Sequence, residues 1–346
     1  MAKVNKILVR GTNWIGDAAM QIPALREVRR LFPSARITLH TRGWAQGIFE
    51  DTDFIDEILA IEPGESKIRD ILGQAKILKE IDFDLAVLFP NSFESALVAK
   101  LGKIPERFGY AKEGRSVFLT NAIEIPEWKN NRHEVFYYLN LVAEIEKIYY
   151  GTQTVLNNEP RFDLHVSEER RVDGQKLLRR NAVDSTKKIV ALGVGSTNSR
   201  AKRWQTESYA RLNDRLQNEL NVNVVLVGAK DELDVSNKVF EKSKSKPTIL
   251  TGKTDLAEAV AILSEIDLLV SNDMGLAHIA SAVGTKTLVI FGPTNPKTTQ
   301  PWNSEIVYKA VECAPCMLRD CPIDHRCMMG ISADEVFEKV VQMLQY

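Results

Sequence analysis

Long apolar runs are missing from this sequence of 346 residues. No stretch approaches the roughly 18 consecutive apolar residues that a membrane-spanning helix needs. The opening residues, MAKVNKILVRG, hold too short an apolar run for a signal peptide and no cleavage-type site. An excess of one charge is also missing, since 45 Lys and Arg face 46 Asp and Glu. Bulk charge therefore gives no basis for binding nucleic acid, and we expect a cytoplasmic protein.

Cysteine is scarce, and the four residues are confined to the segment 313–327. Disulfides that hold a secreted fold together are usually spread along the chain, so this cluster is a local feature. Its pattern is Cys313-x2-Cys316-x4-Cys321-x5-Cys327, which could hold a structural Zn²⁺, with His325 as a substitute ligand. Disulfide pairing and reduced thiols without metal remain open as alternatives.

The rest of the composition is that of an ordinary globular protein, with 44% hydrophobic and 26% charged residues. At roughly 150 residues per domain, the length suggests two domains. Strand and amphipathic helix patterns alternate in two series, separated by the polar linker NNEPRFDLHVSEERRVDGQ. The predicted strands are Lys6–Arg10, Arg36–Thr41, Ile55–Ile61, Phe83–Phe89, Ile189–Leu192, Val222–Val227, Thr248–Leu250, Asp267–Val270 and Thr287–Phe291.

Strand–helix alternation with connections of this length predicts parallel sheets covered by helices on both faces. Ligands bind such sheets at the carboxyl ends of the strands, so we expect the site in a cleft between two similar halves. Pro23 predicts a kink or a restart in the first helix. Ser167 predicts a helix start, and Ser332 with Glu335 predicts a capping box at the final helix.

Polar and glycine-rich segments follow several of the predicted strands. RGTNWIGDAAM places Asp17 at a strand-to-helix bend, where its carboxylate could either stabilise the helix start or take a proton from a substrate. GVGSTNSRAKRW offers loop amides, hydroxyls and Lys202 as a cradle for a diphosphate. SNDMGLAHIASAVG and FGPTNP end two further strands. An acid in one half and a phosphate cradle in the other describe sugar transfer from a nucleotide.

Four segments carry a resemblance to a known family. NWIGDAAMQIPALREVRRLFPSARITLHTRGW, AKRW, SNDMGLAHIASAVGTKTLVIFGPTNP and CAPCMLRDCPIDHRCM are similar to the bacterial ADP-heptose:lipopolysaccharide heptosyltransferases, and most to the heptosyltransferase II branch. The resemblance implies a GT-B fold, with two Rossmann-like domains at 1–165 and 166–330. It also implies that a C-terminal helix, 331–346, returns to pack on the first domain.

The resemblance further implies inverting transfer of L-glycero-D-manno-heptose from ADP-heptose to the inner core of lipopolysaccharide. Asp17 would be the general base, and Lys202 would meet the charge on the leaving diphosphate. No metal would be required for this catalysis. The residues implied for the donor are Gly195, Ser196, Thr197, Asn198, Glu232, Asp273, Met274, Gly275 and His278. Asp231 is the alternative to Glu232 for the acid that binds the ribose. Met274 departs from the Ser or Thr of many relatives, so backbone amides would replace a hydroxyl contact.

The acceptor of this family carries phosphates and acidic sugars, which predicts contacts with basic side chains of the first domain. It also predicts peripheral contact with the cytoplasmic face of the inner membrane. The residues assigned to the acceptor are Asn13, Trp14, Lys103, Arg107 and Arg132, with Arg42 as a further candidate. Two alternatives remain: another sugar-nucleotide transferase or an epimerase of the same fold, and a metal-binding interaction protein built around the cysteines.

Overall fold

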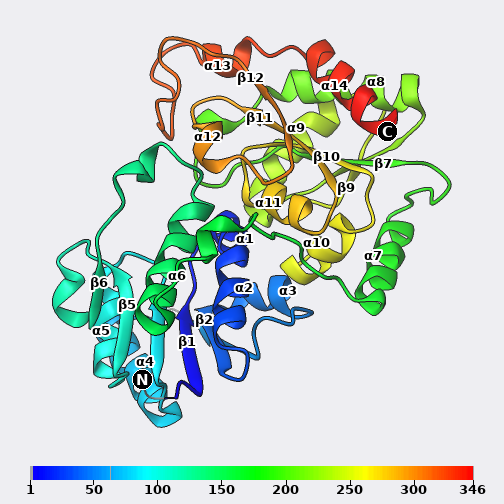
Figure 1. Ribbon diagram of the computed structural model, residues 1–346. Coiled ribbons are helices and arrows are strands. Elements are labelled where there is room, and N and C mark those ends of the chain that lie inside the picture. The colour runs from blue at the N-terminus through cyan, green and yellow to red at the C-terminus, as the bar shows by residue number, and fades with distance from the viewer. Residues whose placement is uncertain (1–2, 63, 346) are drawn as a thin grey trace. The chain divides into compact units, whose positions relative to one another are not determined.

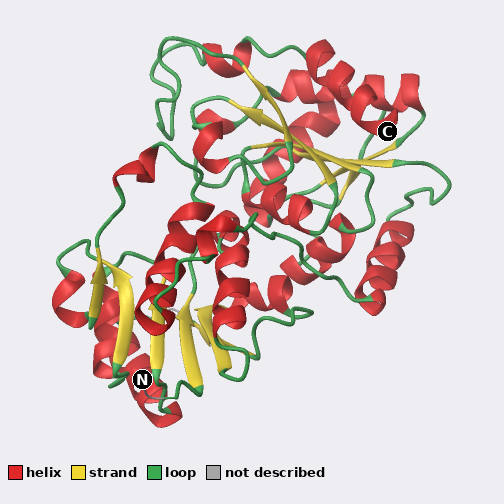
Figure 2. Ribbon diagram, viewed as in Figure 1, coloured by secondary structure: helices red, strands yellow, loops and turns green. Residues whose placement is uncertain are grey.

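The computed structural model describes residues 3–62 and 64–345, and its chain divides into two compact units, Met1–Phe162 and Asp163–Tyr346. The division falls three residues before the predicted boundary at 165. Each unit holds one parallel sheet with helices packed on it (Figures 1 and 2). This is the predicted α/β architecture of two Rossmann-like domains.

The first sheet has the strand order β3-β2-β1-β4-β5-β6, with every neighbouring pair parallel. Its central strands are short and apolar because both faces are covered, as in KILVR and LAVL. The strands are β1 (Lys6–Arg10), β2 (Arg36–Arg42), β3 (Glu57–Ile61), β4 (Leu85–Leu88), β5 (Glu106–Tyr110) and β6 (Asn121–Ile123).

The helices of the first unit fall into two packed sets. Helix α2 packs on α6, while α4 packs on α5, and the α4–α5 set buries Leu8, Ala86 and Leu88 of the sheet. The predicted interruption at Pro23 is confirmed, because α1 ends at Met20 and α2 restarts at Ile22 with the proline in its first turn. The helices are α1 (Ile15–Met20), α2 (Ile22–Leu31), α3 (Gln46–Phe49), α4 (Lys67–Ile81), α5 (Phe93–Leu101) and α6 (Val135–Tyr150).

The second sheet has the order β12-β11-β10-β7-β8-β9 and is also parallel throughout. Its strands are β7 (Ile189–Gly193), β8 (Asn223–Leu226), β9 (Thr248–Ile249), β10 (Leu268–Asn272), β11 (Lys286–Phe291) and β12 (Glu305–Tyr308). Its helices are α7 (Glu168–Arg180), α8 (Thr206–Leu220), α9 (Leu233–Lys242), α10 (Leu256–Leu263), α11 (Gly275–Ala282), α12 (Pro296–Thr299), α13 (Arg326–Met329) and α14 (Ala333–Gln345).

The final helix corrects one expectation. Val336, Phe337, Val340 and Leu344 of α14 lie in the core of the second unit, and α14 packs on α8. The expectation that this helix packs on the first domain is therefore wrong. Its apolar stripe is buried where the sheet of its own unit leaves a face uncovered beside α8. The predicted start is confirmed, since Ser332 Oγ accepts from Glu335 N at 3.1 Å.

Three strands have no counterpart in the sequence prediction. β6 and β12 are edge strands with one paired side, so they need little apolar sequence. β5, ERFGY, lies inside the sheet although it starts with two charged residues. In the part of the chain that the structure describes, no helix combines the length and the apolar character that crossing a membrane requires.

Candidate functional site

A buried asparagine holds the first donor loop of the second unit. Asn272, the last residue of β10, is fully buried. Its Nδ2 donates to the carbonyl oxygens of Val194 and Gly195 at 3.0 and 2.9 Å. Its Oδ1 accepts from Trp204 N at 2.9 Å and from Tyr209 Oη at 3.0 Å. One side chain thus fixes both ends of the 194–204 loop at the carboxyl edge of the sheet.

The predicted diphosphate contact, Lys202, lies directly beside Asp273. Its Nζ is 2.8 Å from Asp273 Oδ2, and the Asp273 side chain is only 7% exposed. Thr294 Oγ1, from the FGPTNP loop, donates to the same carboxylate oxygen at 2.7 Å. Asp273 therefore connects the ends of three segments that the sequence predicted to converge. Lys202 has no other ion pair among the described residues, so its remaining hydrogens can meet an anion without breaking this contact.

Glu232 occupies a buried position behind the same loop. Its Oε2 accepts from Ala229 N at 2.9 Å, and Thr197 Oγ1 lies 3.5 Å from Oε1. A Cβ on Gly195 would come within 2.2 Å of the Glu232 carboxylate, so only glycine leaves room for this acid. Burial raises the pKa of Glu232, against the opposing effect of the Ala229 hydrogen bond. The acid lies in the short helical turn Lys230–Glu232 that follows β8.

The other residues assigned to the donor share this edge of the sheet. Ser196 is buried, and its carbonyl accepts from Arg203, while Thr197 and Asn198 are exposed at the tip of the loop. Met274 is the N-cap of α11, Gly275 begins that helix, and His278 is 7% exposed one turn later. Met274 also packs close to Gly193, where a Cβ would lie 2.9 Å from its sulfur.

The cysteine segment lies against the donor loop. Ala201 N donates to Arg319 O at 2.9 Å, and His325 Nε2 contacts Ala201 O. Arg200 Nε is 2.7 Å from Asp320 Oδ1, and Met317 N donates to Pro293 O at 2.8 Å. The segment therefore braces the turn that carries Lys202.

The thiols themselves are unpaired in this structure, with Cys327 buried and Cys313 exposed. Burial, together with the three neighbouring thiols, raises the pKa of Cys327. Within residues 3–62 and 64–345, no three His, Cys, Asp or Glu side chains are placed to hold a metal ion. The structural zinc therefore stays a prediction.

In the first unit, Asp17 lies in the first turn of α1, directly after the β1 bend. Trp14 and not Asp17 is the N-cap residue. Tyr138 Oη of α6 donates to Asp17 Oδ1 at 3.4 Å. Burial, followed by the charge of Asp17, raises the pKa of Tyr138 well above its ordinary range, so this hydroxyl keeps its proton. The Asp17 carboxylate therefore accepts a hydrogen bond from a neighbouring hydroxyl of α6.

Two of the residues assigned to the acceptor share this bend. Asn13 Oδ1 accepts from Arg10 Nη2 at 3.2 Å, and the Trp14 side chain is 56% exposed. Arg132 lies in the connection that follows β6, with its guanidinium carbon 3.5 Å from the Phe136 ring centroid. These three residues follow the carboxyl ends of their strands.

Lys103 and Arg107 do not fit their predicted role. Lys103 precedes β5 and Arg107 is its second residue, so both lie at the amino edge of a parallel sheet whose carboxyl edge carries Asp17. Arg107 is also 6% exposed, and it donates to the carbonyls of Phe118, Ile104 and Pro105. Strand β5 begins at Glu106, so it places both residues away from the edge that carries Asp17.

Sequence reasoning missed the supporting residues of the site. Asn272, Thr294 and Tyr209 hold the donor loop and Asp273 in place. Asn272 and Thr294 lie in strand-end segments that the sequence analysis had already selected. Their position in these segments could therefore have identified them as site residues. Tyr209 carried no such signal, because it reads as one apolar residue of helix α8.

Comparisons with known proteins agree with this arrangement. The profile of glycosyltransferase family 9 (heptosyltransferase) matches residues 71–326. Lipooligosaccharide heptosyltransferase 2 of Campylobacter jejuni is 26% identical over 98% of both chains, and lipopolysaccharide heptosyltransferase 2 of Salmonella typhimurium is 29% identical over 86% of this chain and 85% of that one.

Solved structures show the same fold. The E. coli ADP-heptose lps heptosyltransferase II superposes with a TM-score of 0.85 at 24% identity, covering 98% of each chain. A family 9 glycosyl transferase from Veillonella parvula superposes with a TM-score of 0.86 at 21% identity, covering 100% of this chain and 98% of that one. With the family profile covering well over half of its length, the chain belongs to glycosyltransferase family 9, the heptosyltransferases.

Proposed function

We propose that this enzyme transfers L-glycero-D-manno-heptose from ADP-heptose to the inner core of lipopolysaccharide, as a heptosyltransferase II-like enzyme. Family membership and the names of the relatives support the reaction class. The observation that carries the donor half is the contact of Lys202 with buried Asp273 and Thr294 at the strand ends of the second sheet. The lipid-linked acceptor would bring the protein to the cytoplasmic face of the inner membrane.

In this reaction the acceptor hydroxyl attacks the anomeric carbon of the heptose. The bond from that carbon to the diphosphate oxygen breaks, ADP leaves, and the configuration inverts. Negative charge grows on the diphosphate, and Lys202 with the amides of the 194–199 loop stabilises it. Glu232 accepts hydrogen bonds from the ribose hydroxyls, and Asp17 takes the proton of the acceptor hydroxyl. Each unit thus supplies one half of the chemistry, and no step requires a metal ion.

Replacement of Asp17 by asparagine tests the proposal. Asp17→Asn keeps the shape of the side chain but cannot take a proton, so turnover should fall roughly 10²–10⁴-fold. Affinity for ADP-heptose, measured by calorimetry, should stay unchanged. Asp70→Asn is the matched control, because Asp70 is also a first-turn acid, in α4. Heptose transfer is measured by mass spectrometry. Near-normal transfer by Asp17→Asn would show that Asp17 only stabilises its helix.

A further inference from the structure

Two arginines at the carboxyl edge of the first sheet form no ion pair with the acidic residues that the structure describes. Arg10 ends β1 and Arg42 ends β2, the neighbouring strand. Neither makes an ion pair with any residue in the described part of the chain. Glu94 acts on Arg10 only at long range, and Glu62 lies against Gly43 without pairing with Arg42.

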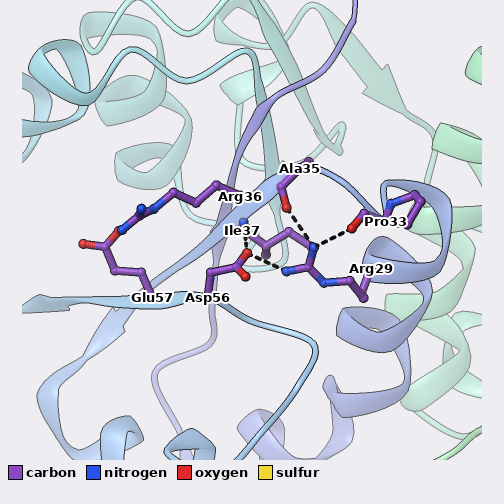
Figure 3. Close-up of polar contacts among 7 residues, drawn as sticks. All are labelled: Arg29, Pro33, Ala35, Arg36, Ile37, Asp56 and Glu57. Carbon is purple, nitrogen blue, oxygen red and sulfur yellow. Dashed lines mark hydrogen bonds and ion pairs between the residues drawn. The ribbon is translucent and has the colours of Figure 1, made fainter.

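The arginines at the opposite edge of the same sheet behave differently. Arg29 is paired with Asp56 at 2.5 Å, and Arg36, the first residue of β2, is paired with Glu57 at 3.0 Å. Figure 3 shows the Arg29 guanidinium held between the Asp56 carboxylate and the carbonyls of Pro33 and Ala35. Arg10 and Arg42 therefore differ from these two arginines, because no described acidic residue pairs with them.

Arg10 is held rigidly but is only partly satisfied. The residue is 9% exposed. Its Nη1 donates to the carbonyls of Gly11 and His40, and its Nη2 donates to Asn13 Oδ1. Nε and the second Nη2 hydrogen have no acceptor among the residues that the structure describes. Nε and Nη2 are neighbouring donors, the arrangement with which arginine binds two oxygens of a carboxylate or phosphate.

A buried histidine, His40, lies beside Arg10 and also has a polar atom that no described residue satisfies. His40 pairs with Arg10 in the register of the sheet and is 2% exposed. Its Nδ1 has no hydrogen-bond partner within residues 3–62 and 64–345. Burial and then the charge of Arg42 lower the pKa of Arg10 to about 10, so the two guanidiniums are close enough to repel each other. Like charges held together in this way are stabilised when an anion binds between them.

We propose that Arg10 and Arg42 bind an acidic group of the sugar acceptor, either a phosphate or the carboxylate of an acidic sugar. This inference rests on the proposed function and names the acceptor chemistry of the same unit. The Arg10–Asn13 hydrogen bond ties the anion site to the bend that leads into α1, and Asp17 lies in the first turn of that helix. An acidic group bound there positions the acceptor beside the residue that takes its proton.

The test is the affinity of the full chain for a deacylated, phosphorylated core oligosaccharide, measured by calorimetry without donor. Arg42→Gln should weaken binding about 10- to 100-fold, as expected for loss of a hydrogen bond to a charged group. Arg10→Lys keeps the positive charge but removes the two neighbouring donors Nε and Nη2, so it should also weaken binding of the oligosaccharide. Arg36→Gln is the matched control on the same strand and should bind normally. ADP affinity should be unchanged in all three variants.

Two modified acceptors identify the acidic group. If phosphatase treatment of the acceptor removes the difference between the wild-type chain and Arg42→Gln, the group is a phosphate; if carboxyl reduction removes it, the group is a carboxylate. Unchanged acceptor affinity in Arg42→Gln and Arg10→Lys overturns the inference, even where heptose transfer is observed. Arginine-dependent binding without any transfer supports the site and refutes the proposed function instead.

Discussion

Replacement of Asn272 by alanine tests the role of the donor loop most directly. Asn272→Ala removes four hydrogen bonds at once, to Val194, Gly195, Trp204 and Tyr209. All of these partners are buried, so each of the four groups left behind must find water or remain unsatisfied.

The expected loss of stability follows from those groups. A buried polar group left without a partner costs about 1–3 kcal/mol. The space vacated by the amide admits a water molecule, which restores part of the bonding. We therefore expect a loss of about 3 kcal/mol. For a unit of this size, that loss lowers the melting temperature by roughly 6–12 °C.

The functional effect has a separate readout. Without Asn272 the 194–204 loop is no longer tied to β10, so Lys202 and the loop amides must be ordered again when ADP binds. We expect ADP affinity to fall about tenfold at a temperature where the variant is folded, which is a cost of about 1.4 kcal/mol. Calorimetric titration with ADP and thermal unfolding measure the two effects on the same sample.

The control is Asn218→Ala, an exposed asparagine of α8 that accepts one hydrogen bond, from Ser245 Oγ. It should change stability by less than about 0.5 kcal/mol. An unchanged melting temperature in Asn272→Ala would refute the energetic argument. Lower stability with unchanged ADP affinity would show that this anchor does not position the donor loop.

Three further predictions concern single side chains. Because burial raises the pKa of Glu232, ADP affinity should weaken as the pH falls from 7 to 5 and the carboxylate gains its proton, and Glu232→Gln should flatten this dependence in calorimetry. Burial lowers the pKa of His40 to about 3, so the unfolded chain takes up a proton below about pH 6.5 that the folded chain refuses. His40→Gln should recover about 2 kcal/mol of that loss by pH 5 in urea unfolding. Cys327→Ser should lower the free energy of unfolding by about 1–3 kcal/mol because the new serine hydroxyl is buried, while Cys313→Ser should leave it unchanged because Cys313 is exposed. Equal losses of stability in thermal unfolding of the two variants would indicate a bound metal instead.

The order of the elements and the positions of the strand-end residues could be predicted from the sequence. Lys6–Arg10 forms a strand with the predicted bounds, and α2 restarts before Pro23. Local rules suffice for such features, because apolar runs, glycines and prolines act within a few residues. The meeting of Lys202 with Asp273 followed from the same reasoning, since the ends of parallel strands share one edge.

Tertiary structure decided everything that depends on which surface an element meets. The amphipathic pattern of α14 requires a partner but does not name it, and the structure supplies the second unit. Lys103 and Arg107 lie at the amino edge of the first sheet because of strand β5, and the two charged residues at the start of this strand concealed it in the sequence. That no carboxylate of the described residues forms an ion pair with Arg10 could not be read from the sequence either, because an ion pair depends on distances between segments far apart in the chain.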